Sequence, residues 1–319
     1  MPTHPGFQPK GVIPAVLLPF DSDFSIDEPS YRAHLRDVAA VAGVSAITTN
    51  AHSTEVASCT FDEQVRVLEI TQDEIGAAVP IVNGIYADGS LEAQRLAKMA
   101  TAGGASALLV FPPSIYGFGQ RVEMAVEHFK RIAEVTDLPL IAFQYPATTG
   151  QGYPLRTLLR MIEEVPGIRA IKDWSGNPQL QDRQVRALQT RNPPVCVLTT
   201  HSAWLFSSLV LGCGGLLSGS GSVIADLQSR LFKAVQANDL AQAQRIHDSI
   251  YQTAEVFYAE PAVDMHNRMK EALVLMGKLP RAVVRPPLVK IADDEIERIR
   301  QALVAAGLLD KGGGLRRAA

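Results

Sequence analysis

The sequence predicts a (β/α)₈ TIM barrel followed by a C-terminal α-helical domain, and three observations carry this prediction. Short apolar runs recur eight times at intervals of roughly 20–35 residues. Stretches with apolar residues three and four apart, the pattern of a one-sided helix, separate the runs. After residue 224 no further run follows, and the remaining segments read as helix.

The eight apolar runs are short and rich in Val, Ile and Leu, as expected for strands buried on both faces of a parallel sheet. Alternation with helices indicates parallel strands joined by crossover connections, and eight such units are the number that closes a barrel. The predicted strands span 11–18, 44–49, 80–86, 105–111, 139–145, 168–172, 195–200 and 215–218. The predicted intervening helices span 28–42, 61–76, 90–102, 121–136, 155–164, 178–189 and 203–211.

The last third of the chain predicts helices only. Two adjacent prolines make 281–287 a non-helical connector between two of these helices. We expect a barrel with a short N-terminal tail over 1–236, a helical domain over 237–310 and a flexible tail over 311–319, which holds three glycines and two arginines. The predicted C-terminal helices span 227–237, 240–258, 266–276 and 293–306.

Composition excludes several classes of protein. Hydrophobic residues make up 47% of the 319 residues and the net charge is −3, without a basic stripe, so no nucleic-acid partner is expected. No uninterrupted apolar stretch reaches about 18 residues, so no membrane span is expected. The three cysteines are odd in number and lack a Cys-x-x-Cys spacing, which indicates reduced thiols and a cytoplasmic location.

Lys172 stands at the downstream end of the sixth predicted strand. In a parallel barrel that end is the active-site face. A buried lysine there has a lowered pKa and can attack a carbonyl carbon to form a Schiff base. An ordinary salt-bridged or solvated lysine is the competing interpretation of this residue taken alone.

Motifs spread along the chain change that balance. The motifs are Gly11 to Phe20, Glu55 followed by Phe61-Asp62-Glu63, Val82-Asn83-Gly84, Gly103-Gly104-Ala105 leading to Phe111-Pro112-Pro113, Tyr145-Pro146 to Gly150, Ile171-Lys172-Asp173, Gly214 to Ser218, and Val284 to Leu288. In order and spacing these motifs resemble the dihydrodipicolinate synthase and N-acetylneuraminate lyase superfamily of Schiff-base aldolases, over residues 10 to 309.

The resemblance implies a barrel with a C-terminal helical domain, assembled as a homotetramer or a dimer. It also implies that Lys172 forms a Schiff base with pyruvate or another small 2-oxo acid, without a cofactor or metal. The protein is then a class I aldolase, retro-aldolase or dehydratase.

The segment after the second strand departs from the family motif Gly-Thr-Thr-Gly-Glu. Here it reads Ala51-His52-Ser53-Thr54-Glu55. The family's carboxylate-holding threonine falls on Ser53, whose hydroxyl can still donate a hydrogen bond. Its relay threonine falls on His52, and an imidazole is itself an acid or base near neutral pH.

The fifth strand departs as well. The family's proton-transferring tyrosine, three residues before Pro146, falls on Phe143. Tyr145 lies on the same strand face, about 7 Å further toward the mouth. Two hypotheses follow: Tyr145 takes over the proton relay, or water and His52 do so.

The second substrate's side of the site also differs. The arginine that grips a second carboxylate in the lysine-biosynthetic synthase falls on Thr148, and the tyrosine from its neighbouring subunit falls near Ser114, with Tyr116 as a substitute. These losses argue against lysine biosynthesis. An apolar mouth favours a less charged substrate, such as an aromatic one; the residues of this mouth are Tyr116, Phe118, Phe143, Trp174 and Leu217. The residues expected to bind substrate are Ser53, Thr54, Phe143, Thr148, Leu217, Ser114 and Tyr116.

Two alternatives compete with the lyase. One is a metal-dependent barrel aldolase with His52, Glu55 and His201 as ligands, which leaves Lys172 without a role. The other is a non-catalytic barrel that binds a 2-oxo acid, since a fold does not guarantee an activity.

Overall fold

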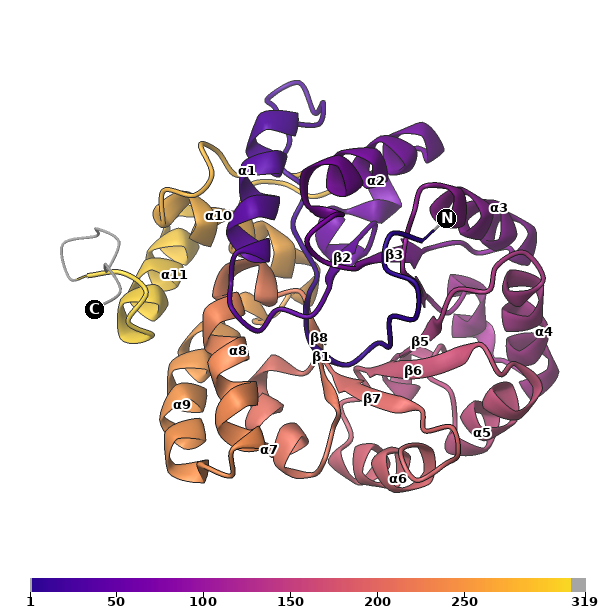
Figure 1. The fold of residues 1–319 in the computed structure, drawn as a ribbon. Coiled ribbons are helices and arrows are strands. Elements are labelled where there is room, and N and C mark those ends of the chain that lie inside the picture. Colours follow the sequence, from indigo (N-terminus) through magenta and orange to yellow (C-terminus); the bar gives the residue numbers. More distant parts are fainter. Residues whose placement is uncertain (1, 311–319) are drawn as a thin grey trace.

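The eight predicted strands form one sheet of parallel strands that closes into a barrel, with helices around it (Figure 1). The computed structural model describes residues 2–310, so the tail predicted at 311–319 lies outside the described residues. The strands are β1 (Gly11–Pro14), β2 (Ile47–Thr49), β3 (Ile81–Ile85), β4 (Ala107–Val110), β5 (Leu140–Gln144), β6 (Ile168–Asp173), β7 (Cys196–Thr199) and β8 (Gly215–Ser218).

Neighbouring strands pair in the order β1-β8-β7-β6-β5-β4-β3-β2. The ring closes between β1 and β2 through two isolated bridges, Val12 with Val44 and Ala15 with Thr48, and through a 3.0 Å bond from the Val16 amide to the Thr48 carbonyl. The predicted barrel is therefore confirmed.

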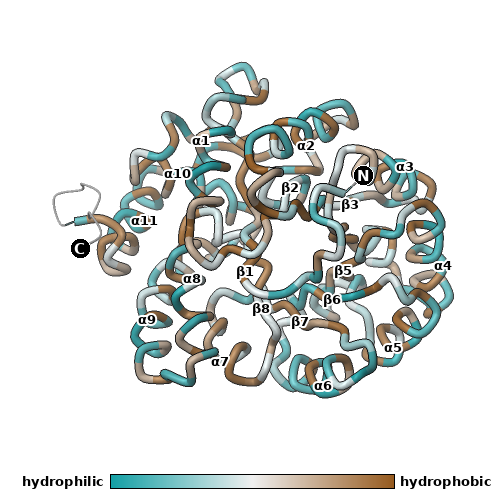
Figure 2. The backbone as a smooth tube through the Cα atoms, in the orientation of Figure 1, coloured by the Kyte–Doolittle hydropathy of each residue, from teal (hydrophilic) through white to brown (hydrophobic). Residues whose placement is uncertain are grey.

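Helices connect successive strands and cover the outside of the ring (Figure 1). Hydrophobic and hydrophilic positions alternate along each of them, as one-sided packing requires (Figure 2). They are α1 (Glu28–Ala39), α2 (Phe61–Ile75), α3 (Ser90–Ala102), α4 (Val122–Ala133), α5 (Leu155–Glu164), α6 (Pro178–Leu188), α7 (Leu205–Val210) and α8 (Gly221–Gln236).

Local sequence determines where several helices begin. The Asp27 carboxylate accepts from the Ser30 amide at the start of α1, and Thr60 and Glu63 form a reciprocal capping box at the start of α2. The sequence predicted a helix from residue 227, whereas α8 begins at Gly221. Its Gly/Ser-rich first turn is separated from the rest by a kink at Ile224, where φ is −120° and ψ is 33°.

Three C-terminal helices follow the barrel: α9 (Leu240–Phe257), α10 (Met265–Leu275) and α11 (Asp293–Ala305). The connector at 281–287 is non-helical, as predicted. These helices pack beside α8 and α1 on one side of the ring (Figure 1). The division into domains at residue 237 stays a prediction.

The loop after β2 carries much of the site, and its backbone is held in a restricted conformation. Asn50 and Glu55, at its two ends, have φ values of 50° and 51°, in the left-handed region. Gly84 lets this loop approach β3, because a Cβ at Gly84 would lie 1.9 Å from the Asn50 carbonyl oxygen.

A buried ion pair ties this loop to the C-terminal helices. The Lys270 ammonium donates to the Glu55 carboxylate, and their side chains are 1% and 6% exposed. Lys270 also donates to the Val283 carbonyl at 2.7 Å, and the second Glu55 oxygen accepts from the Arg285 amide at 3.0 Å. Glu55 therefore joins the barrel, α10 and the 281–287 connector.

We predict that Lys270→Met lowers the free energy of unfolding by about 3–5 kcal/mol, because it leaves a buried carboxylate without its cation. Urea unfolding of the purified protein measures this loss. Arg186→Met is the matched control, since Arg186 forms a surface pair with Asp182, its side chain is 76% exposed, and its loss costs about 1 kcal/mol or less. Equal costs for the two variants would contradict the role given to the buried pair.

Candidate functional site

Lys172 lies at the carboxyl end of β6, inside the mouth of the barrel, and is 6% exposed. Its strand neighbour in register is Phe143 on β5, so the two side chains lie next to each other. The Lys172 Nζ atom stands 4.0 Å from the centre of the Phe143 ring.

Burial lowers the pKa of the Lys172 ammonium from 10.5 to about 7. A change of that size corresponds to roughly 5 kcal/mol against the charged form. The Phe143 ring attracts the ammonium form by about 2 kcal/mol when desolvated, which is the smaller effect. A substantial fraction of Lys172 is therefore an uncharged, nucleophilic amine near neutral pH.

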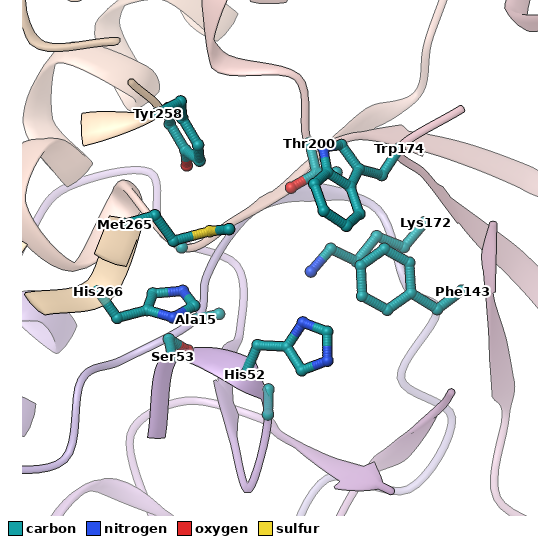
Figure 3. Close-up of a pocket in the computed structure, with 12 residues that line it drawn as sticks. Ala15, His52, Ser53, Phe143, Lys172, Trp174, Thr200, Tyr258, Met265 and His266 are labelled. Carbon is teal, nitrogen blue, oxygen red and sulfur yellow. The ribbon is translucent and has the colours of Figure 1, made fainter. Parts of the chain in front are cut away.

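The amine faces a small cavity, hereafter the inner cavity, of about 40 Å³. Figure 3 shows Lys172, His52 and His266 directed into this space from three separate parts of the chain. The residues that line it are Ala15, Ala51, His52, Ser53, Phe143, Lys172, Trp174, Thr200, Gly219, Tyr258, Met265 and His266.

His52 and Ser53 reach the cavity from a short 3₁₀ turn, His52–Thr54. Thr54 builds this turn: its hydroxyl accepts from the Ala51 amide and donates to the Ala51 carbonyl, both at 2.8 Å. Ser53 is 2% exposed, and its Oγ makes no hydrogen bond within the described protein. A buried hydroxyl without a partner at a cavity wall is suited to bind a ligand oxygen.

His52 forms a hydrogen-bonded pair with Tyr145. The Tyr145 Oη atom lies 2.9 Å from the His52 Nε2 atom, and either group can be the donor, depending on the imidazole tautomer. Burial, with the positive field of Lys172 second, lowers the pKa of His52 to about 3, and burial raises the pKa of Tyr145. Both groups are therefore neutral near pH 7.

Tyr145 itself does not line the inner cavity, and its phenol is hydrogen-bonded to His52, which does. Its ring packs against Phe143 and Trp174, with centroids 4.7 and 5.6 Å away. Of the two hypotheses from the sequence, this geometry favours His52 as the group that meets the substrate and Tyr145 as the group that orients it.

The other expected substrate-binding residues lie away from the inner cavity. Leu217 is fully buried within the barrel on β8, and Tyr116 belongs to the core outside the strands. Thr148 is exposed on a short turn, and Ser114 is exposed with its amide bonded to Asp88 at 2.8 Å. Thr54 shapes the His52 turn and does not line the cavity.

The C-terminal helices complete the site, which the sequence did not predict. His266, at the start of α10, lines the cavity, and its Nε2 atom would lie 3.2 Å from a Cβ placed on Gly219. Burial, with the fields of His52 and Lys172, lowers the pKa of His266 well below its usual value. Tyr258 and Met265 contribute from the same region. A lone histidine on a predicted C-terminal helix carried no signal of this role.

The three residues of the metal-dependent alternative, His52, Glu55 and His201, each have a different partner. Glu55 pairs with Lys270, His52 pairs with Tyr145, and His201 stacks on Trp204 with ring centroids 3.5 Å apart. Residues 2–310 contain no group of three or more His, Cys, Asp or Glu side chains that could hold a metal ion.

None of the helices in residues 2–310 combines the length and hydropathy required of a membrane span.

Solved structures with the same fold cover nearly the whole chain. The dihydrodipicolinate synthase of Thermotoga maritima superimposes with a TM-score of 0.87 at 24% identity, covering 94% of this chain and 99% of its own. YagE, a prophage protein of E. coli K12 in complex with pyruvate, gives the same TM-score, identity and coverage. These likenesses support the barrel and its C-terminal helices.

Sequence relatives extend over the same length. An uncharacterized DapA-like lyase of Halobacterium salinarum is 30% identical over 97% of this chain and 100% of its own. A 4-hydroxy-tetrahydrodipicolinate synthase of Chloroherpeton thalassium is 29% identical over 94% of this chain and 96% of its own. A model of the dihydrodipicolinate synthetase family matches residues 8–306. The chain therefore belongs to the dihydrodipicolinate synthetase family, as its motifs predict.

Proposed function

We propose that the protein is a lyase that forms a Schiff base between Lys172 and pyruvate or another 2-oxo acid. The observation that carries this proposal is the buried Lys172 amine, with its pKa near 7, in a cavity that it shares with the unpartnered hydroxyl of Ser53. An amine and a hydrogen-bond donor on the walls of one cavity match the ketone and the carboxylate of a 2-oxo acid. The complex of YagE with pyruvate supports the same substrate class.

The reaction begins when the neutral Lys172 amine attacks the C2 carbonyl. The carbonyl oxygen leaves as water after protonation, and a positively charged iminium remains, while Ser53 donates to the substrate carboxylate. The iminium accepts the electron pair of a bond broken at C3, which gives a neutral enamine. When that bond is C–H, the neutral His52 imidazole takes the proton, and the hydrogen bond from Tyr145 stabilises an imidazolium that burial otherwise disfavours. Protonation of the enamine and attack by water then release the product and restore the amine.

Several features support a substrate other than that of lysine biosynthesis. Phe143 cannot transfer a proton, and Thr148 is an exposed threonine where the biosynthetic synthase has an arginine. Arg285 does not replace that arginine, because its guanidinium is bonded to Glu63 and to the carbonyls of Phe24 and Ser58. The homotetramer or dimer expected from the resemblance stays a prediction.

Trapping with borohydride tests the proposal. We expect incubation with pyruvate and sodium borohydride to add one reduced pyruvate to the intact protein, and peptide mapping to place it on Lys172. Lys172→Met is the control, since it keeps the side-chain volume but lacks the amine. The absence of an adduct with pyruvate and with a panel of 2-oxo acids would falsify the Schiff-base mechanism.

The pH dependence follows from the lowered pKa of Lys172. The ammonium form cannot attack a carbonyl, so activity is lost below the pKa and is full above it. We expect the exchange of pyruvate methyl protons in D₂O, followed by NMR at low pyruvate, to rise with pH and level off above a midpoint near 7. Exchange without enzyme is subtracted at each pH. A midpoint near 10 would mean that Lys172 is solvated.

Substitutions at the hydrogen-bonded pair separate its two roles. We expect His52→Gln to slow the same methyl exchange by about 10²–10⁴-fold, because the group that moves the proton is lost. Tyr145→Phe removes one supporting hydrogen bond and should slow exchange by roughly fivefold. Both variants should still be trapped by borohydride on Lys172.

A larger loss for Tyr145→Phe than for His52→Gln would show that the phenol meets the substrate directly. Trapping by the unmodified protein without measurable exchange would favour the non-catalytic 2-oxo-acid-binding protein.

A further inference from the structure

A second, wider cavity lies beside the inner one. We call it the outer groove; its volume is about 500 Å³, within the range of pockets for small molecules. His52, Trp174, Met265 and His266 line both spaces, so the two are adjacent. The outer groove is lined by His52, Glu55, Val56, Ala57, Ser58, Tyr86, Trp174, Ala262, Val263, Met265, His266, Arg285, Pro286, Pro287 and Leu288.

The position of the groove determines which part of a substrate it receives. Lys172 and Ser53 occupy the inner cavity, so the ketone and carboxylate of a 2-oxo acid lie there. The inner cavity has room for little more than these groups. The remainder of a longer substrate, from about C4 outward, has to extend beyond the inner cavity, and the adjacent outer groove, past the shared residues His52, Trp174 and His266, is the space that receives it.

The walls of the groove are mainly apolar. Val56 lies on the barrel side, and Val263, Met265 and Leu288 lie on the C-terminal side. Two aromatic side chains, Tyr86 and Trp174, also line it. Such walls stabilise a substituent in proportion to the apolar area that it removes from water.

Each ionisable group of the lining is either neutral or already paired. Glu55 binds Lys270 and the Arg285 amide, and the Arg285 guanidinium binds Glu63 and backbone carbonyls. His52 and His266 are kept neutral by burial. A charged substituent would therefore lose its hydration without gaining a counter-charge, which is costly.

We propose that the outer groove selects a 2-oxo acid whose distal substituent is uncharged and apolar, up to the size of an aromatic ring. In the direction of bond formation, the corresponding partner is an apolar aldehyde that meets the enamine of pyruvate. This inference rests on the proposed function, because it takes the Schiff base at Lys172 as the fixed end of the substrate. It differs from the apolar mouth expected from the sequence, since Tyr116 and Leu217 do not line the groove.

Four 2-oxo acids test the inference in the borohydride assay. The matched pair is 2-oxohexanoate and 2-oxoadipate, which have six carbons each and differ in a terminal methyl or carboxylate; 4-phenyl-2-oxobutanoate and pyruvate complete the set. We expect 2-oxohexanoate to half-saturate adduct formation at a concentration roughly tenfold or more below that of 2-oxoadipate, a difference of about 1.4 kcal/mol. The phenyl compound should half-saturate below pyruvate.

Charges placed in the groove should change this preference in opposite directions. Val263 lies on the groove wall and is 62% exposed, so the protein should tolerate a polar side chain there. We expect Val263→Arg to shift the ratio of the two half-saturating concentrations toward 2-oxoadipate by roughly tenfold, and Val263→Glu to shift it away. Val289→Arg and Val289→Glu are the controls, because Val289 is 75% exposed and is outside the groove lining; they should leave the ratio unchanged.

The outcomes separate the two proposals. Adducts on Lys172 with equal preference for the two six-carbon acids, or a ratio that does not respond to charge at residue 263, overturn the apolar groove alone. No adduct with any of the four acids overturns the Schiff base and, with it, the inference that depends on it.

Discussion

The buried pair between Glu55 and Lys270 is the contact on which the rest of the site depends. Glu55 ends the loop that carries His52 and Ser53, and Lys270 lies on α10, the helix that begins beside His266. A carboxylate and an ammonium buried together attract each other strongly, but removing either one leaves an isolated charge away from water. The pair therefore holds the barrel loop and the C-terminal helix at a set distance, and both cavities lie between them.

Burial has a different consequence for Lys172, which has no carboxylate beside it among residues 2–310. Lys270 has a carboxylate beside it and remains paired, whereas Lys172 has an aromatic ring and two neutral imidazoles around its cavity. Without a counter-ion, burial favours the uncharged amine. Burial lowers the pKa of Lys270 as well, but the Glu55 carboxylate opposes that effect, whereas burial acts unopposed on Lys172.

Much of the fold could be predicted from the sequence, because strand and helix periods repeat eight times and each repeat supports the others. The place of Lys172 followed from that count and from the family motifs. His266 could not be predicted, since its approach to Gly219 depends on how α10 packs on the barrel. Thr148 and Ser114 were expected near substrate from strand order, but the turns that carry them point into solvent.

The distance between the amine and the imidazole is set by the ring of strands. Lys172 belongs to β6 and His52 follows β2, and no local turn connects the two. The position of His52 can therefore hold another residue type while Lys172 keeps its place, because the two residues lie on separate backbone segments. An exchange of residue type at position 52 therefore leaves the amine of Lys172 where it attacks a ketone.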